Sequence, residues 1–375
     1  IQFMQINTLY QLFSMVQSQA PALASAATFL TIPDLFNYWL TGRKVCEFTN
    51  ATTTQAFNPL TGGWATELLS TLGIPTHIFP EIVKPGTVLG SVQRAVAEEL
   101  GLTATIPVVA PACHDTGSAV AAVPAANQRF GWISSGTWSI LGAEVPDAVV
   151  NPETLLYNFT NEGGVSDTYR LCKNVAGLWL VQECRRSWAR AGTELSYAEL
   201  TSLAAAAKPF VAVIDPDHSS FLKPSEPDDD MPSRIQQLCR VNGQPVPTDK
   251  GAIVRCALES LALKYRWVLE KLELILGYQL DPLHMVGGGT QNQLLCQFTA
   301  DAIGRQVIAG PVEATAIGNL VMQMVAMGDL ASLAEGRDLV RRSFDVMTYT
   351  PTRERGVWND AYARLQGQLS PAQGE

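Results

Sequence analysis

The chain is poor in charged residues and has no excess of positive charge. Only 16% of its 375 residues are Asp, Glu, Lys or Arg, while 47% are hydrophobic, a composition that predicts a large buried core and excludes a disordered protein. The formal net charge is -9. Because nucleic acids and anionic membranes are bound by concentrated basic surfaces, we expect neither as a partner. An anionic substrate must instead be bound by local donors, such as the N–H groups at helix N-termini.

Metal and membrane signatures are also missing. The seven cysteines include no Cys-x-x-Cys pair, so we expect no metal site and instead reduced thiols in a cytoplasmic protein. Cys239 and Cys256 lie in two helical patterns joined by residues 243–247, and a helical hairpin would bring them together as free thiols or as a disulfide. The longest apolar region, residues 20–40, is interrupted by polar residues and is no membrane span. No basic leader precedes an apolar core, so we expect no signal peptide.

Three consecutive glycines, Gly287 to Gly289, follow a strand predicted at 283–286 and precede a helix that ends near Gly304. They match neither G-x-G-x-x-G nor G-x-x-x-x-G-K-[ST], which argues against Rossmann and Walker phosphate sites. Such a loop still lets the backbone approach a phosphate, with the N-terminus of the next helix pointing at it. A loop that needs glycine for packing alone fits the pattern equally well. The following strand, 306–309, and helix, 313–327, complete a βαβ unit.

A carboxylate stands where another strand is predicted to end. Asp115 follows the apolar run 106–112 and precedes a helical pattern at 118–122. Ligands of α/β folds bind at the carboxyl ends of strands, so Asp115 is a candidate general base. It is also a candidate N-cap of that helix. His114 beside it is either a hydrogen-bonded structural histidine or a contact to a sugar hydroxyl.

A small-residue turn follows about twenty residues later. Residues 129–144 read as two short strands around Ser135-Gly136-Thr137, a turn that can approach a phosphate closely. A base beside a phosphate cradle is the equipment for moving a phosphoryl group to a hydroxyl. Asn174, in a polar cluster beside the strand 168–175, suits a polyol or a turn. Gln182 and Glu183 fall within a predicted helix, 176–191, where a polar pair is usually solvent-exposed.

Hydrophobic periodicity and turn residues predict the remaining elements. We expect helices over 8–26, 33–41, 92–100, 232–241 and 251–276, a polar loop over 46–62, and a strand followed by an acidic loop over 211–232. Asp228 to Asp230 are N-cap candidates rather than a metal site. Gly318 costs helix stability, about 1 kcal/mol relative to Ala, which predicts a close approach of its helix to something else, the adenosine of a nucleotide being one candidate.

Six motifs, in this order, resemble those of the FGGY carbohydrate kinases, within the actin-like ATPase superfamily. They are residues 113–116, 133–140, 161–164, 173–185, 286–292 and 309–319, and the resemblance runs from about Gln2 to about Trp358. It implies an α/β fold of two actin-like (ribonuclease H-like) domains with a ligand cleft between them. We expect residues 1–125 to be the C-terminal part of the first domain and 126–375 to be the second.

The resemblance also implies an activity, strongest for family members that act on L-rhamnulose: ATP with Mg²⁺ phosphorylates the 1-hydroxyl of that sugar. Asp115 matches the general base, and His114, Thr116 and Asn174 match sugar contacts. Three further residues match nucleotide contacts, namely Thr137, Gln182 and Gly288.

One departure from the family and three alternatives stay open. Nothing in residues 1–60 resembles the family's N-terminal phosphate-binding hairpin, so we expect the first domain to be incomplete and the segment alone to be inactive. Another ketose, such as L-fuculose, L-ribulose or D-xylulose, is one alternative substrate, although residues 161–164 and 177–183 argue against it. A non-catalytic sugar- or nucleotide-binding protein and a hydrolase of the same superfamily are the other two.

Overall fold

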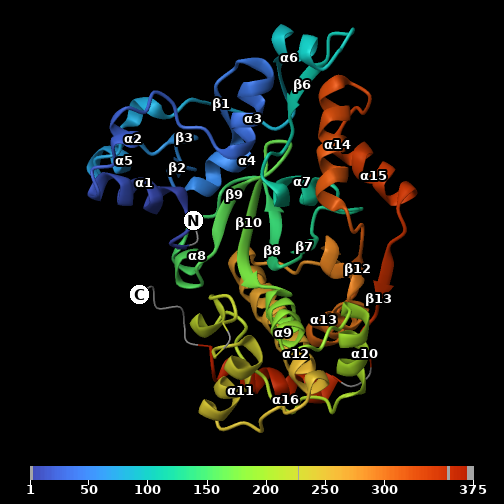
Figure 1. Cartoon of the computed structure of the whole chain (residues 1–375). Helices are drawn as coiled ribbons and strands as arrows, with labels where there is room; N and C mark the ends of the chain where they lie inside the picture. The colour runs from blue at the N-terminus through green and yellow to red at the C-terminus, as the bar shows by residue number, and fades with distance from the viewer. Residues whose placement is uncertain (1–2, 227, 353–354, 370–375) are drawn as a thin grey trace. The chain divides into compact units, whose positions relative to one another are not determined.

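The computed structural model (Figure 1) describes residues 3–226, 228–352 and 355–369. Contacts group the chain into two compact units. The first unit comprises Ile1–Ala126, Glu144–Cys172 and Ala314–Ser343, and the second comprises Asn127–Ala143, Lys173–Glu313 and Phe344–Glu375. Each unit is thus assembled from separated segments. The predicted division into two continuous domains, residues 1–125 and 126–375, is a different kind of division and remains a prediction.

The first unit contains mostly short elements. Its helices are α1 (Thr8–Gln17), α2 (Pro21–Ala24), α3 (Ile32–Thr41), α4 (Phe48–Ala51), α5 (Thr66–Thr71), α6 (Arg94–Glu99), α7 (Asp115–Ala121), α8 (Pro152–Leu156), α14 (Ala314–Met327) and α15 (Leu333–Ser343), with 3-10 turns η1 (Thr52–Thr54) and η2 (Thr76–Ile78). Its strands are β1 (Val45–Glu47), β2 (Phe57–Asn58), β3 (Gly63–Trp64), β4 (Glu81–Val83), β5 (Thr87–Ser91), β6 (Pro107–Ala110) and β9 (Thr160–Gly163).

Strand pairing in the first unit is local. Strand β1 runs parallel to β4, while β2 and β3, and likewise β5 and β6, form antiparallel pairs. Strand β9 pairs antiparallel with the first residues of β10 (Tyr169–Ala176). Helix α3 begins with a proline in its first turn and ends at Gly42, whose φ of 77° is the left-handed conformation that favours glycine. These short elements carry the loop that leads into α7.

Helices α7 and α14 pack closely, although their sequences lie about two hundred positions apart. A Cβ at Gly318 of α14 would stand 1.8 Å from the main-chain oxygen of Ser118 in α7. The close approach predicted for this glycine is therefore confirmed, and the group approached is the backbone of α7. Only a residue without a side chain allows the two helices to cross at this distance.

The second unit is an open sheet with long helices. Its helices are α9 (Trp179–Arg190), α10 (Tyr197–Ala206), α11 (Met231–Val241), α12 (Lys250–Leu276), α13 (Gln293–Ile303) and α16 (Arg355–Gln366), with 3-10 turns η3 (Ser219–Phe221) and η4 (Gly288–Gln291). Its strands are β7 (Gly131–Ser135), β8 (Trp138–Val145), β10, β11 (Leu283–Val286), β12 (Val307–Ala309) and β13 (Met347–Tyr349). The contact boundary falls within β8 and β10, so the end of β8 and the start of β10 count with the first unit.

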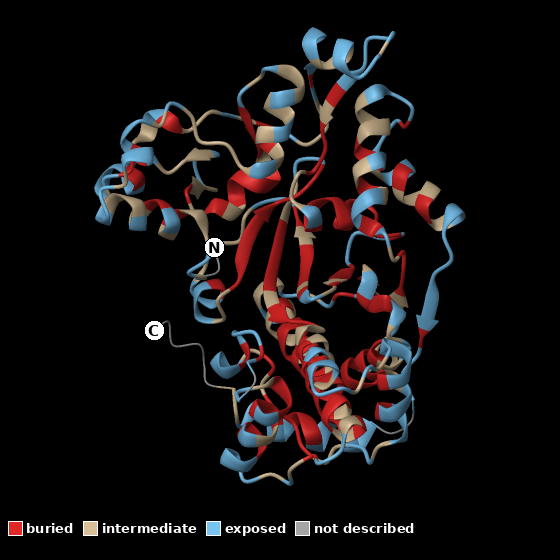
Figure 2. Cartoon of the chain, viewed as in Figure 1, coloured by how far each residue is buried: buried red, intermediate tan, exposed pale blue. Residues whose placement is uncertain are grey.

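The sheet of this unit has the strand order β13-β12-β11-β7-β8-β10. Strand β11 runs parallel to both β7 and β12, and β7 and β8 form the predicted antiparallel hairpin. Figure 2 shows most of the central strands and much of α12 as buried, whereas the edge strand β13 is largely exposed. Helix α12 begins at the N-cap Asp249, whose carboxylate accepts the N–H of Ala252 at 2.8 Å, and ends at Gly277 in the left-handed conformation.

Three secondary-structure predictions were wrong. Residues 8–26 form two helices, α1 and α2, instead of one. The predicted polar loop 46–62 contains β1, α4, η1 and β2, and many of its threonines are buried because their hydroxyls bond to the local backbone. The predicted strand at 211–214 is a buried segment that pairs with no strand among the described residues. The side-chain amide of Gln244 instead accepts the N–H of Val213 and donates to its oxygen. The break between α1 and α2 falls at Gln19, which has a φ of 51°, and before Pro21, the first residue of α2. In the other two cases side-chain hydrogen bonds, which leave no periodicity in the sequence, hold the backbone.

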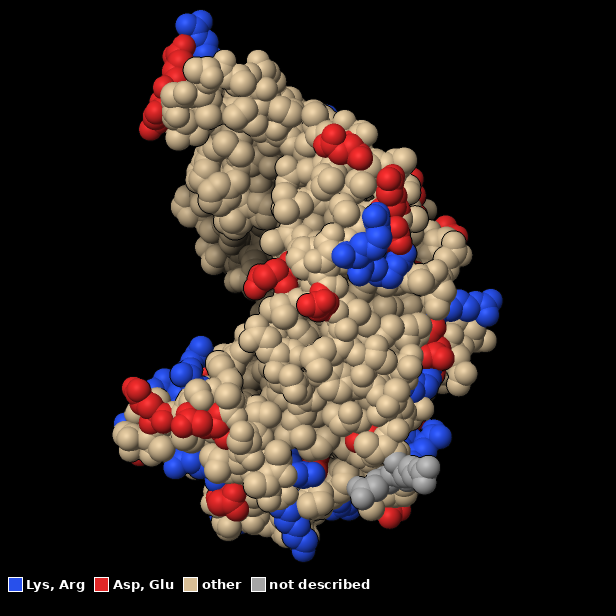
Figure 3. Space-filling model, turned by 90° about the vertical axis from the view of Figure 1, so that its right-hand side faces the viewer, with Lys and Arg blue, Asp and Glu red and all other residues tan. Residues whose placement is uncertain are grey.

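Other expectations are confirmed. Asp230 caps α11 by accepting the N–H of Ser233, and Asp229 pairs with Arg234. Both acidic residues therefore stabilise the start of this helix. Cys239 and Cys256 are neighbours and both are free thiols, and the hydrogen bond between them lowers the pKa of Cys239 and raises that of Cys256. No helix in the described part of the chain is long and apolar enough to cross a membrane. On the face shown in Figure 3, acidic and basic side chains occur in small interspersed groups.

Candidate active site

Asp115 is the first residue of α7, placed there by the strand β6 and the turn 111–114. Its side chain is 79% exposed. Its Oδ1 accepts the N–H of Thr116 at 2.6 Å and the hydroxyl of Thr116 at 3.3 Å. The N-cap is His114, not Asp115, so the alternative of Asp115 as an N-cap was wrong. A carboxylate in the first turn is favoured by the helix dipole, and its second oxygen stays available to a ligand.

A buried acid holds the turn before Asp115. The Glu47 carboxylate accepts the N–H of Cys113 at 2.9 Å, the N–H of Thr49 at 2.9 Å and the hydroxyl of Thr49. The Thr49 hydroxyl in turn accepts the N–H of His114 at 2.9 Å. Burial raises the pKa of Glu47 to about 7. Residues of β1 and α4 thereby hold two consecutive amides of the turn, a connection that no sequence motif predicted.

Behind Glu47 lies a second buried acid. The Asp34 carboxylate accepts the N–H of Glu47 at 3.0 Å and the hydroxyl of Thr31 at 2.6 Å. Burial raises the pKa of Asp34 as well. Helix α3, strand β1 and the turn before α7 are therefore joined by one hydrogen-bonded network. This network holds the turn that precedes Asp115 in a rigid position.

His114 lies in a mostly buried position beside two charged residues. Its side chain is 23% exposed, and its Nδ1 lies 3.4 Å from Nη2 of Arg170, 3.8 Å from Oδ1 of Asp115 and 4.0 Å from Oε2 of Glu162. Burial and Arg170 lower the pKa of His114, and the two carboxylates oppose that shift. Glu162 and Arg170, to which the sequence analysis gave no role, are thus placed next to His114.

Thr116 and Asn174 occupy different surroundings. Thr116 is buried, with its hydroxyl on Asp115, so its contact with a sugar stays a prediction. Asn174 lies half-buried on β10 in the second unit, beside the buried Lys173. Burial lowers the pKa of Lys173 to about 8, partly countered by Asp217 and Asp215.

The three residues expected to contact a nucleotide line one pocket of about 630 Å³ in the second unit. Thr137 comes from the β7–β8 turn, Gln182 from α9 and Gly288 from the turn η4. Because β7 and β11 are parallel neighbours, their carboxyl ends meet, which brings the β7–β8 turn and the triple glycine together. The sequence predicted these residues from separate motifs, and the fold brings them together.

The hairpin turn and α9 are joined by main-chain hydrogen bonds. The N–H of Leu178 donates to the oxygen of Gly136 and that of Trp179 to the oxygen of Thr137, both at 3.0 Å. A Cβ at Gly177 would lie 2.7 Å from the oxygens of Gly136 and Thr137, so this junction requires glycine. Gln182 is half-buried at the pocket, whereas Glu183 is fully buried and accepts the N–H of Ser225. The expectation that both are solvent-exposed was therefore wrong for Glu183.

The pocket suits a nucleotide by its donor chemistry. Its lining side chains are apolar or neutral, including the amides of Gln182 and Asn292, with no Lys or Arg among the described lining residues. Gly287 has φ of 90°, and a Cβ on it would lie 2.8 Å from the oxygen of Ser135, so glycine is needed for the turn itself. A Cβ on Gly288 would meet nothing within 4 Å. Gly288 thus leaves open space that a ligand can occupy, and main-chain and amide donors can bind phosphates there without positive side chains.

Alanine substitutions at two adjacent glycines of this turn should affect different properties, ligand affinity at Gly288 and stability at Gly289. Replacing Gly288 by Ala puts a methyl group into the pocket, and we expect the KM for ATP to rise about tenfold while the unfolding midpoint stays unchanged. Replacing Gly289 by Ala puts a Cβ 2.0 Å from Oγ of Ser135, and we expect about 1–3 kcal/mol of destabilisation. Urea unfolding and ATP titration of the two variants check this. Equal effects on stability would contradict the placement of Gly288 at the ligand.

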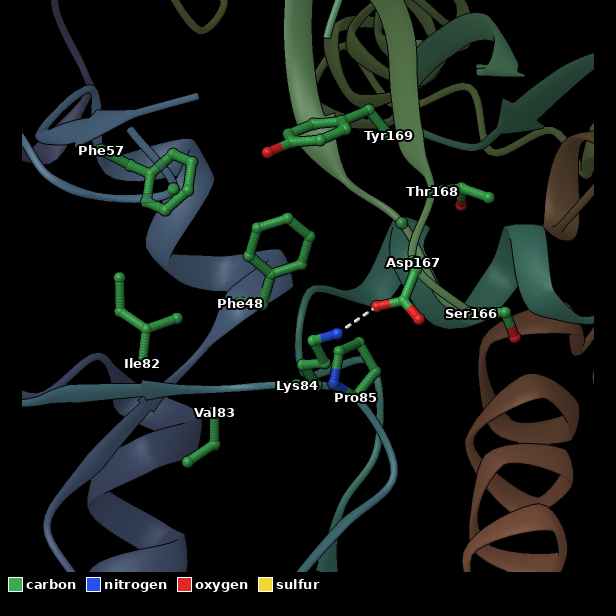
Figure 4. Close-up of a pocket in the computed structure, with 12 residues that line it drawn as sticks. Phe48, Phe57, Ile82, Val83, Lys84, Pro85, Ser166, Asp167, Thr168 and Tyr169 are labelled. Carbon is green, nitrogen blue, oxygen red and sulfur yellow. Dashed lines mark hydrogen bonds and ion pairs between the residues drawn. The ribbon is translucent and has the colours of Figure 1, made fainter. Parts of the chain in front are cut away.

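The first unit has a pocket of its own, of about 360 Å³ (Figure 4). Phe48, Phe57 and Tyr169 form an aromatic wall, and Lys84 makes an ion pair with Asp167 in the turn between β9 and β10. None of the residues predicted for the active site lines it. Its relevance is that it shows how the β9–β10 hairpin is held: Phe48 of α4 contacts the ring of Tyr169 in β10, and Lys84, which follows β4, pairs with Asp167 in the turn. The described residues contain no cluster of three or more His, Cys, Asp or Glu able to hold a metal ion.

The chain is similar to known proteins along most of its length. The sequence models of the FGGY family of carbohydrate kinases match residues 1–122 with the N-terminal domain and residues 131–327 with the C-terminal domain. A rhamnulokinase of Bacteroides thetaiotaomicron is 45% identical over 366 residues, covering 98% of this chain and 73% of that protein. A rhamnulokinase of Oceanobacillus iheyensis is 39% identical, covering 95% of this chain and 73% of that protein.

Solved structures share the fold at lower identity. Xylulose kinase from Rhodospirillum rubrum matches with a TM-score of 0.75 at 19% identity, covering 97% of this chain and 72% of that one. Glycerol kinase from Plasmodium falciparum, solved with ADP, matches with a TM-score of 0.71 at 18% identity, covering 97% of this chain and 74% of that one. The predicted α/β fold of actin-like kinase domains is confirmed. The chain belongs to the FGGY family of carbohydrate kinases.

Proposed function

We propose that this carbohydrate kinase transfers the γ-phosphoryl group of ATP, bound with Mg²⁺, to the 1-hydroxyl of L-rhamnulose, and that it does so in the cytoplasm. The sugar is taken from the rhamnulokinases to which the chain is 39% to 45% identical. One observation carries the nucleotide half of the proposal: Thr137, Gln182 and Gly288 come from three separate motifs and line one pocket.

In this proposal Asp115 is the general base. Its carboxylate is exposed at the start of α7, and only one of its oxygens has hydrogen bonds among the described residues. An exposed carboxylate on a rigid turn can accept the proton of a sugar hydroxyl as the new phosphorus–oxygen bond forms. His114 donates a hydrogen bond to the sugar, and Thr116 and Asn174 are further sugar contacts.

The nucleotide is held by neutral groups. Thr137 and Gln182 offer a hydroxyl and an amide, and the turn at Gly288 leaves room for phosphates near its main-chain N–H groups. Preorganised neutral donors stabilise the charge that develops during phosphoryl transfer. Mg²⁺ arrives with ATP and neutralises part of the phosphate charge.

A panel of ketoses tests the proposal by ADP release. L-Rhamnulose, L-fuculose, L-ribulose and D-xylulose are compared with ATP and Mg²⁺, using this chain and an extended version. The extended version joins the chain to the residues of the Bacteroides relative that lie outside the match. We expect the highest kcat/KM with L-rhamnulose, at least about tenfold above the others, and loss of turnover when EDTA removes Mg²⁺. Comparing the two versions also tests the expectation that the segment alone is inactive.

Each alternative has its own outcome in this assay. A preference for another ketose overturns the choice of sugar and leaves the kinase assignment intact. Equal ADP release with and without sugar indicates a hydrolase. Sugar binding without turnover in either folded version indicates a non-catalytic binding protein.

A further inference from the structure

We propose that Arg170, itself oriented by Glu162, is a positioning residue that holds His114 as a neutral ring with its hydrogen on Nε2, so that His114 offers an N–H donor to the sugar. The inference deepens the proposed function and rests on it where the sugar is concerned. The protonation state of the ring itself is independent of any substrate. None of the motif matches assigned a role to Arg170 or Glu162.

The two charged residues are placed by the β9–β10 hairpin. Glu162 and Arg170 are direct partners in the antiparallel register, and Arg170 is fully buried. Its Nε donates to the main-chain oxygen of Gly163 at 2.8 Å, which fixes the plane of the guanidinium. Nη2 of Arg170 lies 3.1 Å from Oε2 of Glu162. The guanidinium therefore has a single orientation set by its own hairpin.

The hairpin is held against the rest of the unit by close packing. A Cβ on Gly163 would lie 2.6 Å from the ring of Phe48, and one on Gly164 would lie 2.3 Å from the Thr168 hydroxyl. Asp167, in the turn, pairs with Lys84 (Figure 4). The glycines after Glu162 thus have a structural reason, because they let β9 lie against α4. The result is that Arg170 reaches His114 without freedom to move away.

The donor chemistry of arginine determines the histidine tautomer. Nη2 of Arg170 lies 3.4 Å from Nδ1 of His114, in hydrogen-bonding geometry. A guanidinium can donate and cannot accept, so Nδ1 must be the accepting nitrogen. A neutral imidazole with an accepting Nδ1 carries its hydrogen on Nε2. The arrangement also excludes the doubly protonated ring, because that ring would turn an N–H toward the guanidinium.

Charged groups of both signs surround the His114 ring and have opposing effects on its pKa. Arg170 from β10 disfavours a positive ring, whereas Glu162 from β9 and Asp115 from α7 favour one, at 4.0 Å and 3.8 Å from Nδ1. Glu47 from β1 bonds to the adjacent Cys113 N–H, one residue away. Burial and Arg170 are the causes that lower the pKa of His114. Without Arg170, both neighbouring carboxylates would favour a proton on Nδ1.

Two buried atoms of the pair make no hydrogen bond among the described residues. Nη1 of Arg170 is one, and Oε2 of Glu162 is the other, which has only its 3.1 Å ion-pair contact with Nη2 of Arg170. Buried charged groups with unmade hydrogen bonds lower the stability of the folded state, so the ion pair is not explained by a contribution to stability alone. What it supplies is a fixed donor to Nδ1. A neutral His114 also leaves Asp115 free of an imidazolium partner, so that the carboxylate remains able to accept the hydroxyl proton.

Nitrogen NMR of ¹⁵N-histidine-labelled protein tests the inference directly. The chain has four histidines, so the ring signals are few, and His114→Gln assigns the relevant one. We expect Nε2 of His114 to carry the hydrogen and Nδ1 to be unprotonated at neutral pH and above. In Arg170→Met, we expect the hydrogen to appear on Nδ1 and the pKa of His114 to rise. Arg170→Lys, which keeps a charge and a donor, should restore part of the wild-type pattern, and Glu162→Gln should keep Nδ1 unprotonated.

The matched control is Arg337→Met. Arg337 is another largely buried arginine of the first unit and pairs with Glu144 at 2.8 Å, away from His114. We expect this variant to leave the His114 signals unchanged even where it lowers stability. A hydrogen on Nδ1 in the wild type overturns the inference, and so does an Arg170→Met spectrum like that of the wild type. If Arg170→Met does not fold, the Arg170→Lys and Glu162→Gln spectra together with the wild-type tautomer decide.

Kinetics in the extended version separate this inference from the proposed function. We expect Arg170→Met to raise the KM for the sugar at least about tenfold, with the KM for ATP unchanged. The expected tautomer in a protein that phosphorylates none of the ketoses would contradict the proposed function and leave the inference standing. Turnover of L-rhamnulose by a protein with Nδ1 of His114 protonated would contradict the inference and leave the proposed function standing.

Discussion

Replacing Asp115 by Asn should lower kcat by about 100- to 10,000-fold while the KM for the sugar stays nearly unchanged, because a positioned general base contributes about that much to proton transfer. The side chain is 79% exposed, and its Oδ1 already accepts the amide and hydroxyl of Thr116. Asparagine keeps an oxygen for these bonds, so α7 should begin in the same way. What the substitution removes is the ability to take a proton.

Two measurements accompany this prediction. ADP release under saturating ATP gives kcat, and sugar titration followed by tryptophan fluorescence gives the affinity. The control is Asp329→Asn, an equally conservative change at an exposed aspartate of the same unit outside the candidate site. It should leave kcat within about twofold, as expected for a surface substitution. A kcat of Asp115→Asn within tenfold of the wild type would contradict the base assignment.

Replacing Gly318 by Ala should destabilise the protein by about 3 kcal/mol or more. The added Cβ would stand 1.8 Å from the Ser118 oxygen and 2.7 Å from the Ser118 carbonyl carbon. These are backbone atoms of α7, so no side-chain rotation relieves the overlap, and α7 and α14 must move apart. Because Asp115 begins α7, and the Thr315 hydroxyl of α14 donates to its main-chain oxygen, activity should fall along with stability.

Gly356→Ala is the matched control for the helix-propensity effect. Gly356 lies in α16, and a Cβ there would meet nothing within 4 Å. Alanine favours a helix over glycine by about 1 kcal/mol, so this variant should be neutral or slightly more stable. Urea unfolding of both variants measures the difference. A Gly318→Ala protein as stable as Gly356→Ala would show that the two helices do not cross as closely as the structure has them.

The sequence predicted the elements that have a strong local signal. The strand before Asp115, the hairpin around Ser135 to Thr137, the long helix α12 and the strand before the triple glycine all appeared where periodicity and glycine placed them. Hydrophobic periodicity and turn chemistry are local properties, so a single sequence carries them. The three residues expected to contact a nucleotide came from the resemblance to the family, in motifs at the β7–β8 turn, in α9 and at the triple glycine. Their convergence on one pocket is a consequence of parallel strands ending at one edge.

The parts that escaped prediction depend on contacts between distant segments. Glu47 and Thr49 lie in a run of threonines that reads as a polar loop, and only the fold shows that they hold the amides of residues 113 and 114. The role of Arg170 depends on the hairpin register and on His114, fifty-six residues away. The burial of Glu183 was missed because, besides Arg186 of the same helix, its carboxylate accepts the N–H of Ser225, forty-two residues away. Buried polar networks of this kind leave no period in the sequence.

In the proposed reaction a phosphoryl group passes from ATP to the 1-hydroxyl of L-rhamnulose. NMR of the product made by the extended version from ATP and ¹³C1-labelled L-rhamnulose tests this transfer directly. We expect one sugar phosphate whose phosphorus signal is split by the labelled carbon, formed in amounts equal to the ADP released. A phosphate on any other carbon, or release of inorganic phosphate in place of a sugar phosphate, would contradict it.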